Sequence, residues 1–258
     1  MTVDRKPAVL IVHGSWHRPC HYEFLTRQLE KLGFEAVCPA LPSIGKDRLG
    51  KSWRDDVMCV REAAQQLFDR NQQVVLLGHS YGGIPASAAT EGLTRLERAA
   101  AGLPGGFCHA IYLSAFALPA RNLSLLQAVG GCFPDWMEFG EVGSVSKDRS
   151  TFVNEKAAEV LYNDLSHAQI RWALGELVPQ SQSAVEHGIP FSAADVATPK
   201  TFIICEKDRA MTVDVQEMLI AAIPEMMSHR IDTGHSPFLS KPEELAHLVA
   251  DISQASWT

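Results

Sequence analysis

The stretch that decides the fold is VVLLGHSYGG, residues 74–83. Its leading apolar residues predict a buried strand, and the residues after Ser80 have the pattern of a helix. Between them lies the motif G-x-S-x-G, in which Gly78 and Gly82 flank Ser80. In this strand–turn–helix context the glycines permit a sharp turn that lifts the serine hydroxyl clear of the sheet, as a nucleophile requires. The alternative is a glycine-rich turn with an incidental serine, and the partners available to Ser80 decide between the two.

Short apolar runs alternate with helical patterns on both sides of this turn. Unbroken apolar runs predict strands buried on both faces, and hence a parallel sheet with helices on each side. The expected fold class is therefore α/β, with a doubly wound, mostly parallel sheet. The predicted strands cover residues 8–12, 34–39, 73–77, 109–116, 200–208 and 227–232. The predicted helices cover residues 21–33, 52–70, 81–100, 213–223 and 242–254.

The alternation of strands and helices stops between residues 118 and 197. This segment lacks runs typical of buried strands and contains aromatic and helical pieces such as FPDWMEF and YNDLSHAQIRWALGEL. Because no low-complexity linker flanks it, we expect it to pack on the core. The predicted organisation is a core of residues 1–117 and 198–258 with a helical cap, residues 118–197, inserted in it.

A serine hydroxyl needs a base to remove its proton, and the chain contains ten histidines. His235 follows the last predicted strand, in a loop that opens at the same sheet edge as Ser80. His79 is adjacent to Ser80 in the sequence and cannot easily reach back to its hydroxyl, so we expect a structural role for it. His235 is therefore the predicted base.

The base in turn needs an acid that fixes its tautomer. Asp208 follows the penultimate strand at the same sheet edge, and the chain order Ser80, Asp208, His235 is typical of a catalytic triad on such a sheet. Glu206 is the competitor, but it lies nearer the strand end. Asp232 is expected to hold the loop of the base.

A tetrahedral intermediate requires N–H donors aimed at its developing negative charge. One donor is expected from Tyr81, the residue after the nucleophile. The other is expected from the loop VHGSWH after the first strand, where His13 and Gly14 turn the chain and Ser15 presents its N–H. This reading makes the backbone of Tyr81, rather than its ring, the part that takes part in the chemistry.

Composition argues against several other classes of function. The chain carries 23 basic and 30 acidic residues, a net charge of -7, without a Lys/Arg run, so no nucleic-acid partner is expected. The longest apolar stretch, around CHAIYLSAFAL, is too short to span a bilayer, and no signal peptide is visible. The six scattered cysteines form no C-x-x-C pair, which predicts a reducing, cytoplasmic environment and neither a disulfide frame nor a metal site.

Six motifs are shared with a known family: LIVHGSWH, LLGHSYGG, AFALPARN, FPDW, CEKDRAM and GHSPFLSKPEEL. On these residues the chain resembles the α/β-hydrolase superfamily throughout its length, and within it the plant methylesterase and hydroxynitrile lyase group. The resemblance implies a helical cap over the site and no cofactor. It assigns the triad to Ser80, Asp208 and His235, the oxyanion donors to Ser15 and Tyr81, and part of the substrate channel to Trp136.

Two departures from the lyase members of that group favour hydrolysis. Those members place a threonine where Gly14 stands and a lysine where Ser236 stands. The expected activity is therefore that of a serine hydrolase that cleaves a small or medium apolar carboxylic ester through an acyl-enzyme intermediate. Two alternatives stay open: a lyase or carbon–carbon bond hydrolase that uses the same triad, and a non-enzymatic receptor for a small ligand.

Aromatic residues near the predicted site suggest an apolar pocket for the substrate. Phe116, Trp136 and Phe238 flank the site in the sequence and are predicted to form the pocket wall. The expected partner is a small-molecule substrate. The oligomeric state stays open, a homodimer included.

Overall fold

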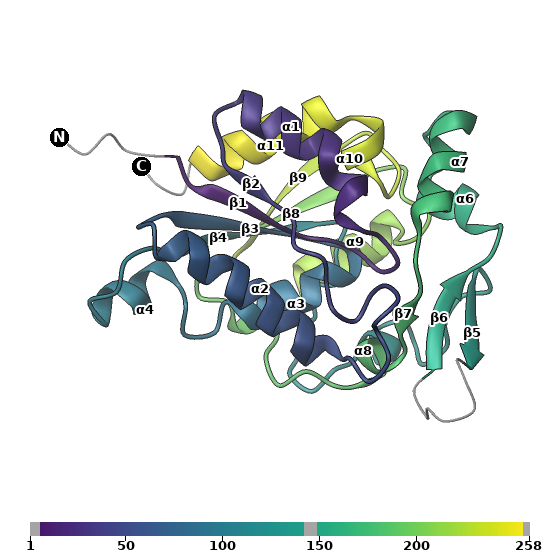
Figure 1. The fold of residues 1–258 in the computed structure, drawn as a ribbon, viewed down its shortest axis with the longest axis horizontal. Coiled ribbons are helices and arrows are strands. Elements are labelled where there is room, and N and C mark those ends of the chain that lie inside the picture. Colours follow the sequence, from purple (N-terminus) through teal and green to yellow (C-terminus); the bar gives the residue numbers. More distant parts are fainter. Residues whose placement is uncertain (1–5, 142–148, 255–258) are drawn as a thin grey trace.

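Six apolar segments form one parallel sheet in a computed structural model that describes residues 6–141 and 149–254. The strand order is β2-β1-β3-β4-β8-β9 (Figure 1). Strands β1, β4 and β8 are buried along their whole length, as expected where helices cover both faces of a sheet. The strands are β1 (Ala8–Val12), β2 (Ala36–Val37), β3 (Gln73–His79), β4 (Gly106–Leu113), β8 (Lys200–Cys205) and β9 (Met226–Ile231).

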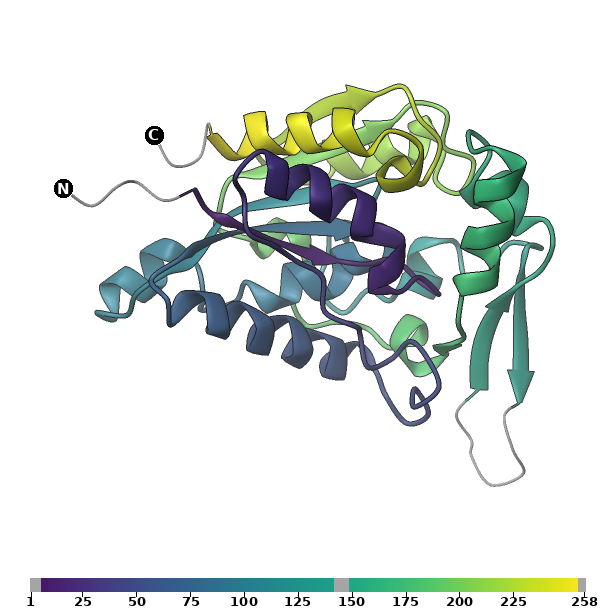
Figure 2. The ribbon, with the colours of Figure 1, turned by 45° about the horizontal axis from the view of Figure 1, so that its top comes forward.

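Helices cover the two faces of the sheet (Figures 1 and 2). Val9 and Ile11 of β1 pack with α1, α10 and α11, whereas Leu10 and Val12 face the opposite way and pack with α2 and α3. The predicted doubly wound α/β fold is thereby confirmed. The helices of these layers are α1 (Glu23–Lys31), α2 (Trp53–Phe68), α3 (Gly83–Ala89), α4 (Arg95–Ala100), α9 (Val213–Ala221), α10 (Pro237–Ser240) and α11 (Pro242–Gln254), with short 3-10 turns η1 (Pro19–Tyr22) and η2 (Ser80–Gly82).

The single helix predicted over residues 81–100 is in fact the turn η2 followed by two helices, α3 and α4. The chain breaks at Gly92, whose φ is +71°, and restarts at Thr94. The Thr94 hydroxyl accepts a hydrogen bond from the Glu97 N–H at 3.2 Å, and the Glu97 carboxylate accepts one from the Thr94 N–H at 3.0 Å. This reciprocal capping starts a new helix, which the apolar spacing alone does not reveal.

The segment between β4 and β8 contains strands as well as helices, so the prediction of a purely helical segment at residues 118–197 is corrected. Three strands form an antiparallel sheet in the order β5-β6-β7, and in Figure 2 this sheet lies with α6 and α7 at one end of the central sheet. The elements are α5 (Leu125–Ala128), β5 (Met137–Glu141), β6 (Arg149–Val153), α6 (Ala157–Leu161), α7 (His167–Glu176), β7 (Gln180–Ser181), α8 (Ser183–Glu186) and η3 (Ala193–Asp195).

The carboxyl ends of β1 and β3 adjoin at the point where the strand order reverses. After β1 the chain crosses to β2 on one side, and after β3 it crosses to β4 on the other. Val12 pairs with Gly78, so the loops that follow both strands emerge side by side. Ligands of open parallel sheets bind at such a switch point.

Within the described ranges, no helix combines the length and apolar character needed to cross a membrane.

The turn from β3 into α3 is packed against the end of β1. A Cβ at Gly82 would collide with the Val12 carbonyl oxygen and lie 2.7 Å from the His13 carbonyl oxygen. A Cβ at Gly78 would lie 2.8 Å from the Gly83 Cα on the far side of the turn. The two glycines of G-x-S-x-G are therefore fixed by space, because both face backbone atoms.

Replacing Gly82 by alanine is expected to destabilise the protein by about 3 kcal/mol or more, because the added methyl group meets backbone oxygens of the central sheet. The matched control is Gly175→Ala in α7, where a Cβ meets nothing within 4 Å. There alanine should stabilise the helix by about 0.5 kcal/mol. Urea unfolding of both variants measures the difference, and equal stability of the two would contradict the packing described.

Candidate active site

Ser80 stands at the tip of the turn that follows β3. Its φ is +52°, in the left-handed region that non-glycine residues rarely adopt. The residue is half-buried, and it lines a cavity together with Ser15 and His235. Backbone strain of this kind is concentrated at functional sites, where the surrounding structure holds it in place.

His235 and Asp208 form a buried pair beside this cavity. The His235 Nδ1–H donates to the Asp208 Oδ2 at 2.7 Å, which leaves Nε2 as the acceptor nitrogen of the ring. The Ser114 hydroxyl also donates to that oxygen, and Oδ1 accepts from the N–H groups of Ala210 at 2.7 Å and Met211 at 2.9 Å. The carboxylate is thus held by four donors, as a buried charge must be.

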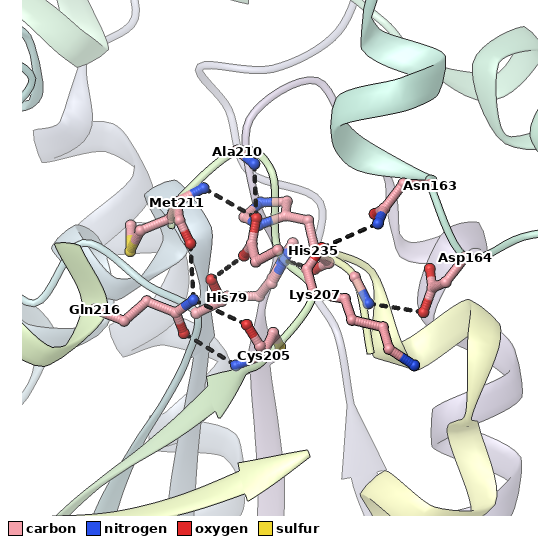
Figure 3. A network of polar contacts seen from close by, with 12 residues as sticks. His79, Asn163, Asp164, Cys205, Lys207, Ala210, Met211, Gln216 and His235 are labelled. Atoms are coloured by element: carbon pink, nitrogen blue, oxygen red, sulfur yellow. Dashed lines mark hydrogen bonds and ion pairs between the residues drawn. The ribbon is translucent and has the colours of Figure 1, made fainter. Parts of the chain in front are cut away.

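Gln216 in α9 fixes the loop that carries Asp208 (Figure 3). Its Nε2 donates to the carbonyl oxygens of Cys205 at 3.1 Å and Met211 at 2.7 Å. Its Oε1 accepts from the Cys205 N–H at 3.0 Å. One fully buried amide therefore ties the end of β8 to the residues on the far side of Asp208.

His79 connects the base to the loop after β1, in agreement with the structural role expected for it. The His79 Nε2–H donates to the His235 carbonyl oxygen at 2.9 Å, so Nδ1 is an acceptor in the neutral ring. The Tyr22 hydroxyl donates to this Nδ1 at 2.7 Å and accepts from the Gly14 N–H at 3.0 Å. Burial lowers the pKa of His79 well below its ordinary value, which keeps the ring neutral and the direction of these bonds fixed.

The two predicted oxyanion donors follow the carboxyl ends of two adjacent strands, β1 and β3. Ser15 follows β1 and lines the cavity. The N–H of Tyr81 belongs to the first turn of η2, where N–H groups have no partner within the helix. The Tyr81 ring points elsewhere, since its hydroxyl donates to the Asp56 Oδ2 at 2.5 Å. Burial raises the pKa of Asp56 to about 6, although hydrogen bonds from Ser43 and Tyr81 oppose the shift.

The cavity is mainly apolar beyond the polar groups of the site. Phe116 and Trp136 line it, as the sequence suggested. The prediction for Phe238 is corrected: the ring is fully buried and is not part of the lining. It stacks on the Tyr22 ring, with 4.1 Å between centroids, because α10 turns it into the core behind His79.

Two residues of the VHGSWH loop were not singled out by the sequence analysis. Trp16 lines the cavity, packs edge-on against Trp136 and donates from its indole N–H to the Thr151 carbonyl oxygen at 3.1 Å. His17 also lines the cavity, and its ring contacts the Ser15 carbonyl oxygen at 2.8 Å. The signal for both was their place next to Ser15, at the carboxyl end of the first strand.

Comparisons with known proteins agree with this architecture. The model of the alpha/beta hydrolase family matches residues 9–248. An alpha/beta hydrolase of Aspergillus novofumigatus, nvfD, is 34% identical over 253 residues, which cover 96% of this chain and 97% of the relative. Methylesterase 1 of Arabidopsis thaliana is 26% identical, with 96% and 97% covered. The crystal structure of polyneuridine aldehyde esterase superposes with a TM-score of 0.80 at 22% identity, and 96% and 99% of the two chains are covered.

Acidification is expected to destabilise the protein between about pH 7 and pH 5. Burial lowers the pKa of His13 from 6.5 to about 4 and holds those of His17 and His79 well below 6.5. Below about pH 6.5 the unfolded chain takes up protons at these histidines and the folded protein does not, so unfolding becomes easier as the pH falls, by on the order of 1 kcal/mol per pH unit for each group.

Asp56 acts in the opposite direction, because its pKa of about 6 lets the folded protein bind a proton that the unfolded residue has released. One carboxyl group opposes these three histidines, and burial also lowers the pKa of His21 and, to about 4, that of His109, so the net effect remains destabilising. Urea unfolding at pH 7.5 and pH 5.5 measures it, and Asp56→Asn should make the loss of stability steeper. An unfolding free energy that is equal or larger at pH 5.5 would refute the assignment of these rings as neutral.

Proposed function

The chain belongs to the alpha/beta hydrolase family, and from this premise we propose that it is a carboxylic ester hydrolase that works through an acyl-enzyme intermediate. The observation that carries the proposal is the buried His235–Asp208 pair, in which His235 lines the same cavity as a serine held at positive φ. The names of several relatives as methylesterases, and of a structural neighbour as an esterase, support an ester as the substrate.

The reaction proposed has two halves. The Ser80 Oγ attacks the ester carbonyl carbon while the His235 Nε2 takes its proton, and the oxyanion accepts hydrogen bonds from the N–H groups of Ser15 and Tyr81. The bond to the alkoxy group then breaks, and His235 returns the proton to the departing alcohol. Water, deprotonated by the same ring, attacks the acyl-enzyme and releases the acid with restoration of Ser80.

Asp208 holds His235 in the tautomer that this sequence of proton transfers needs. Because its carboxylate accepts from His235 Nδ1–H, the other ring nitrogen is the one available to Ser80. The donors from Ser114, Ala210 and Met211 hold the Asp208 carboxyl group in the orientation in which it can stabilise the imidazolium that forms in each half-reaction.

The cavity supports an acyl group that is neutral, apolar and of small or medium size. Its walls are made largely of aliphatic and aromatic side chains, among them Leu125, Phe133 and Met211, and among the described residues neither Lys nor Arg lines it. Apolar sites with a few convergent polar groups are typical of small-molecule ligands.

The alternatives find less support in the site. A Cβ at Gly14 would lie 2.9 Å from His79 Nδ1 and 3.1 Å from Ser80 Cβ, so the threonine of the lyase members has little room in this chain. A non-enzymatic receptor does not need a histidine whose tautomer is fixed by a carboxyl group that itself accepts four hydrogen bonds, as Asp208 does. Both arguments favour hydrolysis.

Replacing Ser80 by alanine should lower kcat for p-nitrophenyl butyrate by at least about 1000-fold, because the nucleophile is lost while the fold is kept. The matched control is Ser236→Ala, which removes the hydroxyl next to His235. That hydroxyl is buried and has no hydrogen-bond partner within the described part of the chain, so kcat should stay within about 3-fold. Residual activity of Ser80→Ala near the wild-type level would rule out the proposed nucleophile.

An ester whose acyl group carries a carboxylate should be a poor substrate. Burial of a charge in a cavity without a cation to pair with it costs several kcal/mol. We therefore expect kcat/KM for the p-nitrophenyl monoester of succinate to be at least about 100-fold below that for p-nitrophenyl butyrate, an acyl chain of the same length. Similar values for both would contradict an apolar acyl site.

A further inference from the structure

Three consecutive residues between α6 and α7, here called the clamp segment (Tyr162, Asn163 and Asp164), reach the three loops that carry the proposed chemistry. We propose that the clamp segment is a positioning device that sets the geometry of the triad and of the oxyanion loop. The inference rests on the proposed function, since it assigns a role within the same site.

Asp164 holds the loop of the base. Its Oδ2 accepts from the Gly234 N–H at 2.8 Å, and Gly234 immediately precedes His235. Asn163 holds the loop of the acid in the same way: its Nδ2 donates to the Lys207 carbonyl oxygen at 3.0 Å, and Lys207 immediately precedes Asp208. Figure 3 shows both side chains pointing from the segment toward these loops. Each bond thus acts one residue away from a member of the triad.

The two loops are also joined to each other, since the Lys207 N–H donates to the Thr233 carbonyl oxygen at 2.8 Å. The clamp bonds therefore act on a coupled pair of loops. A shift of either loop would change the position of the His235 ring relative to Ser80, and displacements of about 1 Å can cost about 100-fold in rate.

Tyr162 holds the oxyanion loop through His17. The Ser15 carbonyl can only accept, so the contact of 2.8 Å to His17 Nδ1 requires a proton on that nitrogen. Burial keeps the His17 ring neutral, and its Nε2 is then an acceptor. The Tyr162 hydroxyl lies 3.0 Å from Nε2 and donates to it. The chain of bonds Tyr162–His17–Ser15 holds the Ser15 carbonyl, whose peptide unit directly follows the one that carries the proposed donor N–H, and so restrains the oxyanion loop at Ser15.

The clamp segment is packed against Gly234 without room for a side chain. A Cβ at Gly234 would collide with Asn163 Oδ1 and lie 2.8 Å from Asp164 Oδ1. Both oxygens are buried and lack a hydrogen-bond partner within the described residues. Buried unsatisfied oxygens destabilise a fold, and their presence at this point is consistent with a functional constraint.

None of the three clamp residues lines the cavity, so we expect the substrate to make no direct contact with them. A positioning role therefore predicts a fall in kcat with little change in KM. A merely structural role predicts a lower melting temperature and a normal kcat for the molecules that remain folded.

The test compares Asp164→Ala with Asp164→Asn in the full-length protein. Alanine removes the acceptor for the Gly234 N–H, whereas the asparagine oxygen can still accept, and its amide can donate to the unpaired Asn163 oxygen nearby. We expect Asp164→Ala to lower kcat for p-nitrophenyl butyrate by about 10-fold or more, with KM within about 3-fold, and Asp164→Asn to stay within about 3-fold of wild type. Glu159→Ala, which removes an exposed carboxylate of α6, is the control for loss of charge.

The rate of Ser80 phosphonylation by a fluorophosphonate is measured in parallel. If the wild-type protein reacts with the probe but does not hydrolyse esters, the proposed function fails, and the clamp is still tested by a slower labelling of Asp164→Ala. If wild-type and Asp164→Ala are labelled and turn over equally fast, the clamp fails alone. If Asp164→Asn turns over and is labelled as slowly as Asp164→Ala, the clamp proposal is also overturned. Loss of the hydrogen bond from the Gly234 N–H would then not explain the lower rates.

A second variant keeps the proposal falsifiable if Asp164→Ala does not fold. Tyr162→Phe retains the buried ring and removes only the donor to His17, and we expect kcat to fall by about 5-fold. The matched control is Tyr112→Phe, which also loses a buried hydroxyl contact; its partner is the Ser87 hydroxyl of α3 at 2.9 Å. Equal kcat values for these two variants would overturn the role of Tyr162.

Discussion

The constraint on which the rest of the structure depends is the contact between the turn after β3 and the end of β1. The backbone at Gly82 lies against the Val12 and His13 carbonyl oxygens, which leaves no space for a Cβ. Because the backbone at Gly82 lies so close to the end of β1, the chain has to turn sharply before it enters α3. Ser80, at the tip of this turn, has a φ of +52°. The strain at Ser80 is supported by the adjacent strands β1 and β3.

Around this turn the protein builds a network of hydrogen bonds with fixed directions. Burial keeps His17 and His79 uncharged, so each ring has one donor and one acceptor, and each hydrogen bond has a defined direction. The Asp208 carboxyl group accepts four hydrogen bonds. A site of this kind needs little reorganisation when charge develops on a substrate, which is the main source of catalytic power in the proposed reaction.

The sequence predicted those parts of the fold and site that depend on local pattern. The unbroken apolar runs of β1, β3 and β8 and the glycines around Ser80 need no knowledge of distant contacts. The break before Thr94 was missed because a capping interaction overrides helical spacing there. The strands β5 to β7 were missed because their residues do not form apolar runs, and because β7 pairs with β6 across the intervening helices α6 and α7.

Side-chain direction in loops was the least predictable property of the site. Phe238 follows His235 closely in the sequence, but only the turn of α10 shows that its ring packs on Tyr22 instead of facing the cavity. Asn163 and Asp164 have the composition of an ordinary turn, and their contacts with Lys207 and Gly234 bridge segments that the sequence places far apart. Such contacts follow from the way the segment between β4 and β8 folds back onto the core, which no local pattern encodes.

The central claim is that Ser80 carries the acyl group during turnover. Rapid-quench mass spectrometry with p-nitrophenyl butyrate tests it directly, because the activated leaving group makes acylation faster than deacylation. We expect a burst of about one nitrophenolate per chain and a butyryl group on the peptide that contains Ser80. A burst with the butyryl group on any other residue, or turnover that proceeds with an acyl-enzyme absent at every quench time, would contradict the account.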